Sequence, residues 1–234
     1  MKKKSFAFAA CAAGLAIGSF AQASVVFSGS GNNPEVNLMA SGSAMFTISG
    51  NTLTLVLTNT TLPRTTAQGN ALTGVTFDIG NGAAVLTLTS TALTSGADYW
   101  TSKTSTNNAA ALNGSWTNVL GASPLAAYGV ATTGFNGRFN GGSIALGNSA
   151  PNYGIVAAGT FDGTNVAFGG SQFPFVQNSM TFTFTGVSGY TEAQINNVSL
   201  LFGTDGTGIV RVPAPGSLAL IGLGGLVAAR RRRA

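Results

Sequence analysis

Carboxylates are the side chains of this sequence that best suit acid–base or metal chemistry. The chain has six acidic residues, no histidine and a single cysteine, Cys11, which lies near the N-terminus. Ser-His-Asp and Cys-His nucleophile systems are therefore excluded, and so are ordinary zinc sites. A glycosidase needs only two carboxylates across the scissile bond. The candidates are Glu35, Asp78, Asp98, Asp162, Glu192 and Asp205. Nothing in their spacing selects a pair, so we predict no catalytic residue and rank a glycan-acting hydrolase last.

Two short segments contain the oxygen ligands that calcium prefers. They are Asp162-Gly163-Thr164-Asn165 and Asp205-Gly206-Thr207-Gly208. Each lacks the dense acidic spacing of a calcium loop, whereas an aspartate before a glycine is typical of a turn. We therefore predict turns here, no metal site and no cofactor.

Aromatic residues in the centre of the chain form the remaining candidate site. Tyr99, Trp100, Trp116 and Tyr128 lie in an irregular region among glycines and asparagines. Rings that stack on sugar faces, with asparagines bonding the hydroxyls, would form a saccharide site. Packing in the core is the alternative role for such rings. The sequence leaves both roles open, and the first makes a carbohydrate-binding module the second functional hypothesis.

The elements that would position these residues lie between two terminal segments of special composition. Residues 1–23 combine Lys2 to Lys4, an apolar run from Phe6 to Phe20, and the small-x-small site Ala21-Gln22-Ala23. This is the pattern of a cleavable secretory signal helix, which predicts export by the general machinery and cleavage by signal peptidase before Ser24. Cys11 is removed with it, so the mature chain forms no disulfide.

The other terminal segment, residues 212–234, has three parts. They are Val212-Pro213-Ala214-Pro215-Gly216, an apolar run from Ser217 to Ala229, and the cluster Arg230, Arg231, Arg232 and Arg233. The apolar part predicts a helix of about 21 Å, short against a hydrocarbon core of about 30 Å. An arginine cluster beside such a helix stays cytoplasmic, which leaves the body outside. A plain membrane anchor would need only the helix and the arginines. The two prolines instead present an extended, stiff segment such as a peptidase groove can hold.

This three-part tail resembles the PEP-CTERM sorting signal, with Ala214 where that family usually has glutamate. The resemblance implies that an exosortase is the partner. The exported precursor would be held transiently in the inner membrane of a Gram-negative bacterium that makes exopolysaccharide, until it is cut and its body moves to the cell surface or extracellular matrix. The body also resembles, more loosely, exosortase-dependent surface proteins of no assigned activity.

The net charge of the body, without the two terminal segments, is slightly negative. The whole chain has a formal net charge of +5, but seven of its eleven basic residues lie in the two segments. The remaining four are outnumbered by the six acids. Without a basic patch for phosphates, we expect no nucleic-acid partner.

Alternation with a period of two dominates the body, residues 24–205. In Asn51 to Thr60, leucines 53, 55 and 57 share one face and threonines the other, and Ala44 to Ile48 precedes this strand as a hairpin partner. Val75 to Ile79 and Val85 to Thr89 are read as a second hairpin, because Gly80-Asn81-Gly82 has favoured turn chemistry. Met180 to Thr185 and Val198 to Phe202 are further strands, the latter the last one, and residues 206–211 are read as a linker.

Many short strands without helices predict an all-β body, an antiparallel β-sandwich resembling a jelly roll. With the terminal signals, the first functional expectation is an exported surface or matrix protein. It would have a structural or adhesive role in exopolysaccharide or biofilm and no enzymatic activity.

Overall fold

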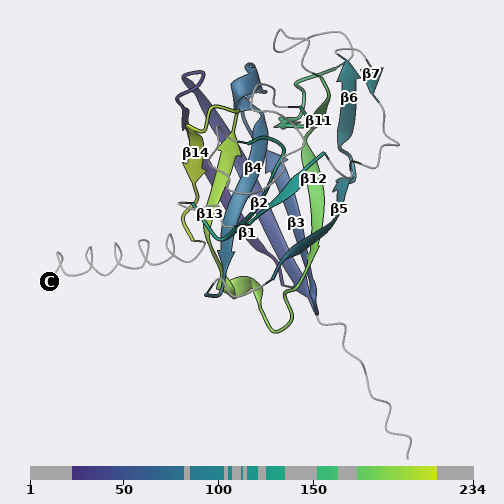
Figure 1. Cartoon of the computed structure of the whole chain (residues 1–234). Coiled ribbons are helices and arrows are strands. Elements are labelled where there is room, and N and C mark those ends of the chain that lie inside the picture. Colours follow the sequence, from purple (N-terminus) through teal and green to yellow (C-terminus); the bar gives the residue numbers. More distant parts are fainter. Residues whose placement is uncertain are drawn as a thin grey trace, which may run out of the picture.

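The computed structural model describes residues 23–81, 85–102, 105–106, 112, 115–120, 125–134, 152–162 and 173–214. These residues form an all-β body of two sheets, one of them strongly curled into a half-barrel (Figure 1). The predicted signal helix and the predicted apolar C-terminal helix lie outside the described residues.

The first sheet has five strands in the order β1-β2-β3-β12-β5. Their bounds are β1 Val25–Asn33, β2 Leu38–Ser49, β3 Thr52–Asn59, β12 Ser179–Thr185 and β5 Thr87–Leu93. β2 and β3 form the predicted hairpin, and every second residue of β3 from Leu53 onward is buried. The period of two was therefore a correct guide to this sheet, because one of its faces is packed and the other is open.

The second sheet has nine strands, with the main path β14-β13-β4-β10-β11-β6-β7 and with β9 joining β8 to β4. Their bounds are β4 Leu72–Ile79, β6 Asp98–Ser102, β7 Ser105–Thr106, β8 Thr117–Leu120, β9 Tyr128–Ala131, β10 Ile155–Val156, β11 Phe175–Gln177, β13 Ile195–Phe202 and β14 Gly208–Arg211. The short β10 and β11 pair in parallel, and every other pair of described strands is antiparallel. Two 3₁₀ turns, Gln68–Asn70 and Glu192–Gln194, complete the described elements.

The second predicted hairpin is wrong. β4 belongs to the second sheet, where it pairs with β13, β9 and β10, whereas β5 crosses to the first sheet and pairs with β12. Gly80 has a φ of 55°, so the expected turn residue is there. A glycine turn can also lead a chain from one sheet to another. β4 is buried along nearly all of its length, as is expected of a strand inside a sheet that has neighbouring strands along both of its edges.

The predicted linker at 206–211 is also wrong, because β14 occupies Gly208–Arg211 and pairs with β13. The body therefore extends beyond residue 205, and the strand at Val198 to Phe202 is not the last one. Alternation was hard to see in so short an edge strand, which has only four residues and a single buried side chain, that of Val210.

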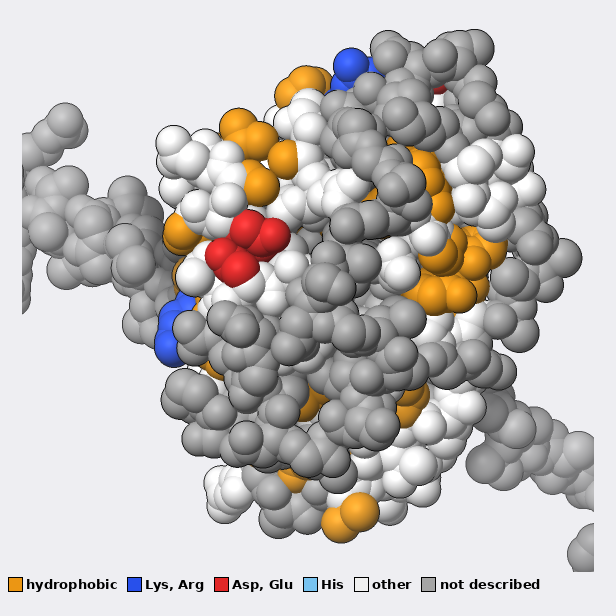
Figure 2. Space-filling model, turned by 45° about the horizontal axis from the view of Figure 1, so that its top comes forward, with side chains coloured by type: hydrophobic (Ala, Val, Ile, Leu, Met, Phe, Trp, Pro, Cys, Tyr) orange, Lys and Arg blue, Asp and Glu red, His pale blue; other side chains and the backbone are white. Residues whose placement is uncertain are grey.

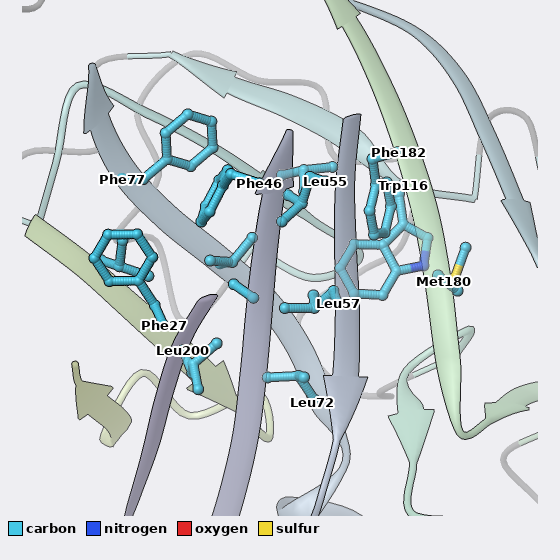
Figure 3. Close-up of a cluster of buried hydrophobic side chains, with 14 of the residues drawn as sticks. Phe27, Phe46, Leu55, Leu57, Leu72, Phe77, Trp116, Met180, Phe182 and Leu200 are labelled. Carbon is cyan, nitrogen blue, oxygen red and sulfur yellow. The ribbon is translucent and has the colours of Figure 1, made fainter. Parts of the chain in front are cut away.

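The core lies between the two sheets and is built mainly from phenylalanine and leucine (Figure 3). Phe46 packs edge-on against Phe27, with ring centroids 5.7 Å apart, and against Phe77 at 5.0 Å. These three rings come from β1, β2 and β4 and so join the first sheet to the second. Burying each such side chain contributes about 1.5–3 kcal/mol, which makes this contact a main source of cohesion between the sheets.

Candidate functional site

The predicted signal-peptidase site borders the first strand. Ala23 and Ser24 are exposed, β1 begins at Val25, and the Ser24 and Thr47 hydroxyls lie 2.8 Å apart. Ala21 lies outside the described residues. Cleavage before Ser24 would leave one residue ahead of β1.

The predicted sorting segment borders the last strand in the same way. β14 forms an antiparallel ladder with β13 from Ser199↔Arg211 to Phe202↔Gly208. The ladder is extended by one bond, in which the N–H of Val212 donates to the carbonyl of Val198 at 2.9 Å. Val212 is buried, and Pro213 and Ala214 are exposed. The sheet therefore ends at Val212, and the proline segment starts directly after it. Pro215, Gly216 and Arg230 to Arg233 lie outside the described residues.

Two glycines of β1 make room for this end of the chain. A β carbon on Gly29 would lie 3.1 Å from a methyl group of Val210 and 3.1 Å from one of Val212, and a β carbon on Gly31 would lie 3.3 Å from Val210. The strand that follows the N-terminal signal thus packs against Val210 and against Val212, the first residue of the predicted sorting segment. This corner was not predicted from the sequence, although the alternating glycines of Gly29-Ser30-Gly31 in a strand were a signal of close approach by other side chains.

The carboxylate of Glu35 accepts a hydrogen bond from the turn between β13 and β14. The Glu35 carboxylate accepts a bond from the N–H of Thr204 at 3.0 Å, and within the turn Asp205 accepts bonds from the N–H and the hydroxyl of Thr207, both at 2.7 Å. Partial burial raises the pKa of Glu35, as does the nearby charge of Asp205, whereas the bonds from backbone N–H groups lower it. Asp205 is thus a turn residue, as predicted.

Two other carboxylates, those of Asp78 and Glu192, also accept hydrogen bonds from the body. Asp78 accepts bonds from the N–H of Ala127 at 2.6 Å and from the Asn197 amide at 2.9 Å. Glu192 accepts a bond from the N–H of Ile48 at 2.7 Å. Asp98 lies at the start of β6, opposite Gln177, and Asp162 follows Phe161. Within the described ranges no three side chains gather in a way that could hold a metal ion. On the face of the molecule drawn in Figure 2, the described side chains form only small acidic and basic areas.

Tyr99 and Trp100, two of the four candidate saccharide contacts, are buried next to each other on β6. Tyr99 is stacked on Tyr153 with ring centroids 5.9 Å apart and an interplanar angle of 9°. Burial raises the pKa of Tyr99 to about 12, aided by its hydrogen bond with Tyr153. Trp100 is in a separate cluster, 5.4 Å from Phe161.

Trp116 and Tyr128, the other two candidates, belong to the main core. Trp116 is 2% exposed, packs 5.0 Å from Phe182 and donates from its indole to the carbonyl of Tyr153 at 3.1 Å. Tyr128 is 4% exposed and packs 6.2 Å from Phe77. Rings buried in this way leave almost no face for a sugar, which favours the core-packing alternative for all four residues.

No family model, no curated protein and no solved structure matches this chain. Among the described residues, no helix is long and apolar enough to cross a bilayer.

Proposed function

We propose that this chain is an exported, non-enzymatic surface or matrix protein, with a structural or adhesive role in exopolysaccharide or biofilm. The body is a β-sandwich resembling a jelly roll. The tail is a PEP-CTERM-like signal that an exosortase reads at Val212 to Gly216, while the inner membrane transiently holds the apolar run and Arg230 to Arg233 stay cytoplasmic.

The observation that carries this proposal is the order of elements at the end of the body. The last strand closes the sheet at Val212, and the exposed Pro213 and Ala214 follow at once. A processing enzyme could therefore reach the proline segment without unfolding the sheet. A plain anchor would not need this segment.

The alternative of a carbohydrate-binding module that uses Tyr99, Trp100, Trp116 and Tyr128 has no support from their burial. A hydrolase has no support from the carboxylates, four of which, those of Glu35, Asp78, Glu192 and Asp205, accept hydrogen bonds from backbone N–H groups.

The test is to fractionate producing cells with and without the sorting enzyme and to measure the intact mass of the protein in each fraction. We expect a shortened body in the matrix of the complete strain and a full tail in the membrane of the deficient strain. A chain with all four tail arginines changed to alanine is the control for orientation. Finding the matrix protein still ending at Ala234 would contradict the sorting role.

A further inference from the structure

The five strands of the first sheet contain no charged residue. The strand sequences are VVFSGSGNN, LMASGSAMFTIS, TLTLVLTN, SMTFTFT and TLTSTAL. The described charged residues of the body lie in turns, in loops or on the second sheet. The solvent-facing surface of a sheet normally carries lysine and glutamate. The absence of both residues from all five strands therefore distinguishes the first sheet from an ordinary exposed sheet.

Side chains that point away from the core form cross-strand rows of hydroxyl groups. One row runs Ser28, Ser43, Thr58 and Ser179, a second runs Thr47, Thr54, Thr183 and Ser90, and a third runs Ser49, Thr52, Thr185 and Thr87. Most of these side chains are exposed or half-buried, so no described element covers this surface. We call it the hydroxyl face.

An apolar row lies between the hydroxyl rows. Val26 of β1 is opposite Met45 of β2, which is opposite Val56 of β3. Val26 is 49% exposed and Met45 36% exposed. The apolar row thus lies between the first and second hydroxyl rows, and the second and third hydroxyl rows are adjacent. Neighbouring strands are about 4.8 Å apart, and alternate residues of one strand are about 6.8 Å apart.

This chemistry excludes several kinds of partner. Nucleic acids and anionic lipids need lysine or arginine, and typical protein interfaces depend on tryptophan, tyrosine or arginine anchors. The hydroxyl face has none of these residues. An ionic polymer would lose hydration on contact without gaining an opposite charge, whereas an uncharged polymer loses little. A neutral sugar chain presents the matching surface, with hydroxyl groups at its edges and C–H groups on its ring faces.

We propose that the hydroxyl face binds neutral polysaccharide. The serine and threonine rows exchange hydrogen bonds with sugar hydroxyls, and the Val26–Met45–Val56 row contacts the C–H faces. Each contact is weak, so binding depends on many contacts along one polymer chain. This inference deepens the proposed adhesive role and rests on it, but it places binding on the first sheet instead of on the four buried aromatic residues.

The test is co-sedimentation of the full chain, purified in mild detergent, with insoluble cellulose and insoluble mannan as neutral probes and with alginate gel as the anionic comparison. The variant Thr54→Lys/Thr183→Lys puts two charges in the middle of the hydroxyl face. Asn196→Lys, at an exposed position of β13 in the second sheet, is the matched control. Thr54→Val/Thr183→Val keeps the branched shape and removes only the hydroxyls.

We expect saturable binding of the unchanged protein to at least one neutral probe, insensitive to salt, and little binding to alginate. The lysine pair should weaken binding at least about tenfold, the loss of about 1.4 kcal/mol of binding energy, and the valine pair should weaken it less. The control should bind normally. Circular dichroism of each variant shows whether the fold is kept.

Three results would overturn the proposal. One is equal binding by all variants, which would place the site elsewhere. Another is no binding to either neutral probe. The third is concentration-dependent dimerisation that the lysine pair abolishes, which would make the hydroxyl face an interface between two copies. None of these results bears on sorting, because the fractionation experiment tests export and processing separately.

Discussion

Val212 packs directly on Gly29, so that a β carbon on Gly29 would lie only 3.1 Å from a methyl group of Val212. This contact joins the first strand of the body to the residue that precedes the proline segment. It closes the corner where β1 of the first sheet meets β14 of the second.

Replacing Gly29 with valine should destabilise the body by about 1–3 kcal/mol, because the added side chain must displace Val210 and Val212 from a packed corner. The measurement is the free energy of unfolding from denaturant titration. Ser30→Val is the control, since Ser30 is exposed on the same strand. Equal stability of both variants would show that the corner is not tightly packed.

The β13–β14 ladder should limit how far a protease can trim the chain. A non-specific protease at low concentration should remove the tail and stop at or beyond Val212, because cleavage needs an extended, unpaired segment and β14 is paired. Intact mass spectrometry gives the new C-terminus. In the Gly29→Val variant, trimming should continue into Gly208–Arg211. A product of the unchanged protein that ends before Gly208 would contradict this expectation.

Glu35 should make the stability of the body depend on pH. Its pKa in the folded protein is raised, chiefly by burial, so its favourable contribution is present at acid pH, where the group is neutral, and is lost as the pH rises through the folded pKa. Glu35→Gln, neutral at every pH, should therefore gain stability relative to the unchanged protein between pH 3 and pH 7. Thermal unfolding across this range measures the difference. In an Asp205→Asn background the gain should be smaller, because one cause of the raised pKa is gone. A gain independent of pH would refute this account.

Tyr99 should ionise at a higher pH than is usual for a tyrosine. Its pKa is raised to about 12 by burial and by Tyr153, and ultraviolet titration at 295 nm reports tyrosinate formation. Tyr153→Phe should bring this late ionisation to a lower pH, whereas Tyr190→Phe should leave it in place. A titration in which no group ionises late would show that Tyr99 is not held as the structure has it.

Trp116→Ala should cost about 3–5 kcal/mol of stability, the usual cost of removing a large buried aromatic side chain. Denaturant unfolding measures this loss, and Thr54→Ala on the open face of β3 is the control with a small effect. A stable Trp116→Ala protein that has lost polysaccharide binding would instead support the saccharide role for the central aromatic residues.

Strands with one packed and one open face could be predicted from the sequence. β3 and β12 alternate leucine or phenylalanine with threonine, and the structure buries the apolar set in both. The pattern could not say which strands pair when they are distant in the chain. β3 lies beside β12, more than a hundred residues away, and short strands such as β10 have no alternation to read.

The candidate sites show the same difference between what local sequence predicts and what depends on residues far apart in the chain. The turn role of Asp205 was visible locally, since the following glycine and threonine mark a turn. The burial of Trp116 depends on Phe182 and Tyr153, which lie far along the chain. The hydroxyl face was present as threonine alternation, but its extent emerges only when the cross-strand register brings the rows together.

The absence of a linker after β14 has a mechanical consequence. If the tail is held at a membrane as proposed, any drag on the body must pass through β14, since only Val212 separates the strand from the exposed Pro213. That load is shared by the ladder with β13 and by the contact of Val210 and Val212 with β1. The corner at Gly29 therefore helps to hold the terminal strand in the body under load. If this corner were weakened, β14 would detach before the core between the sheets opened.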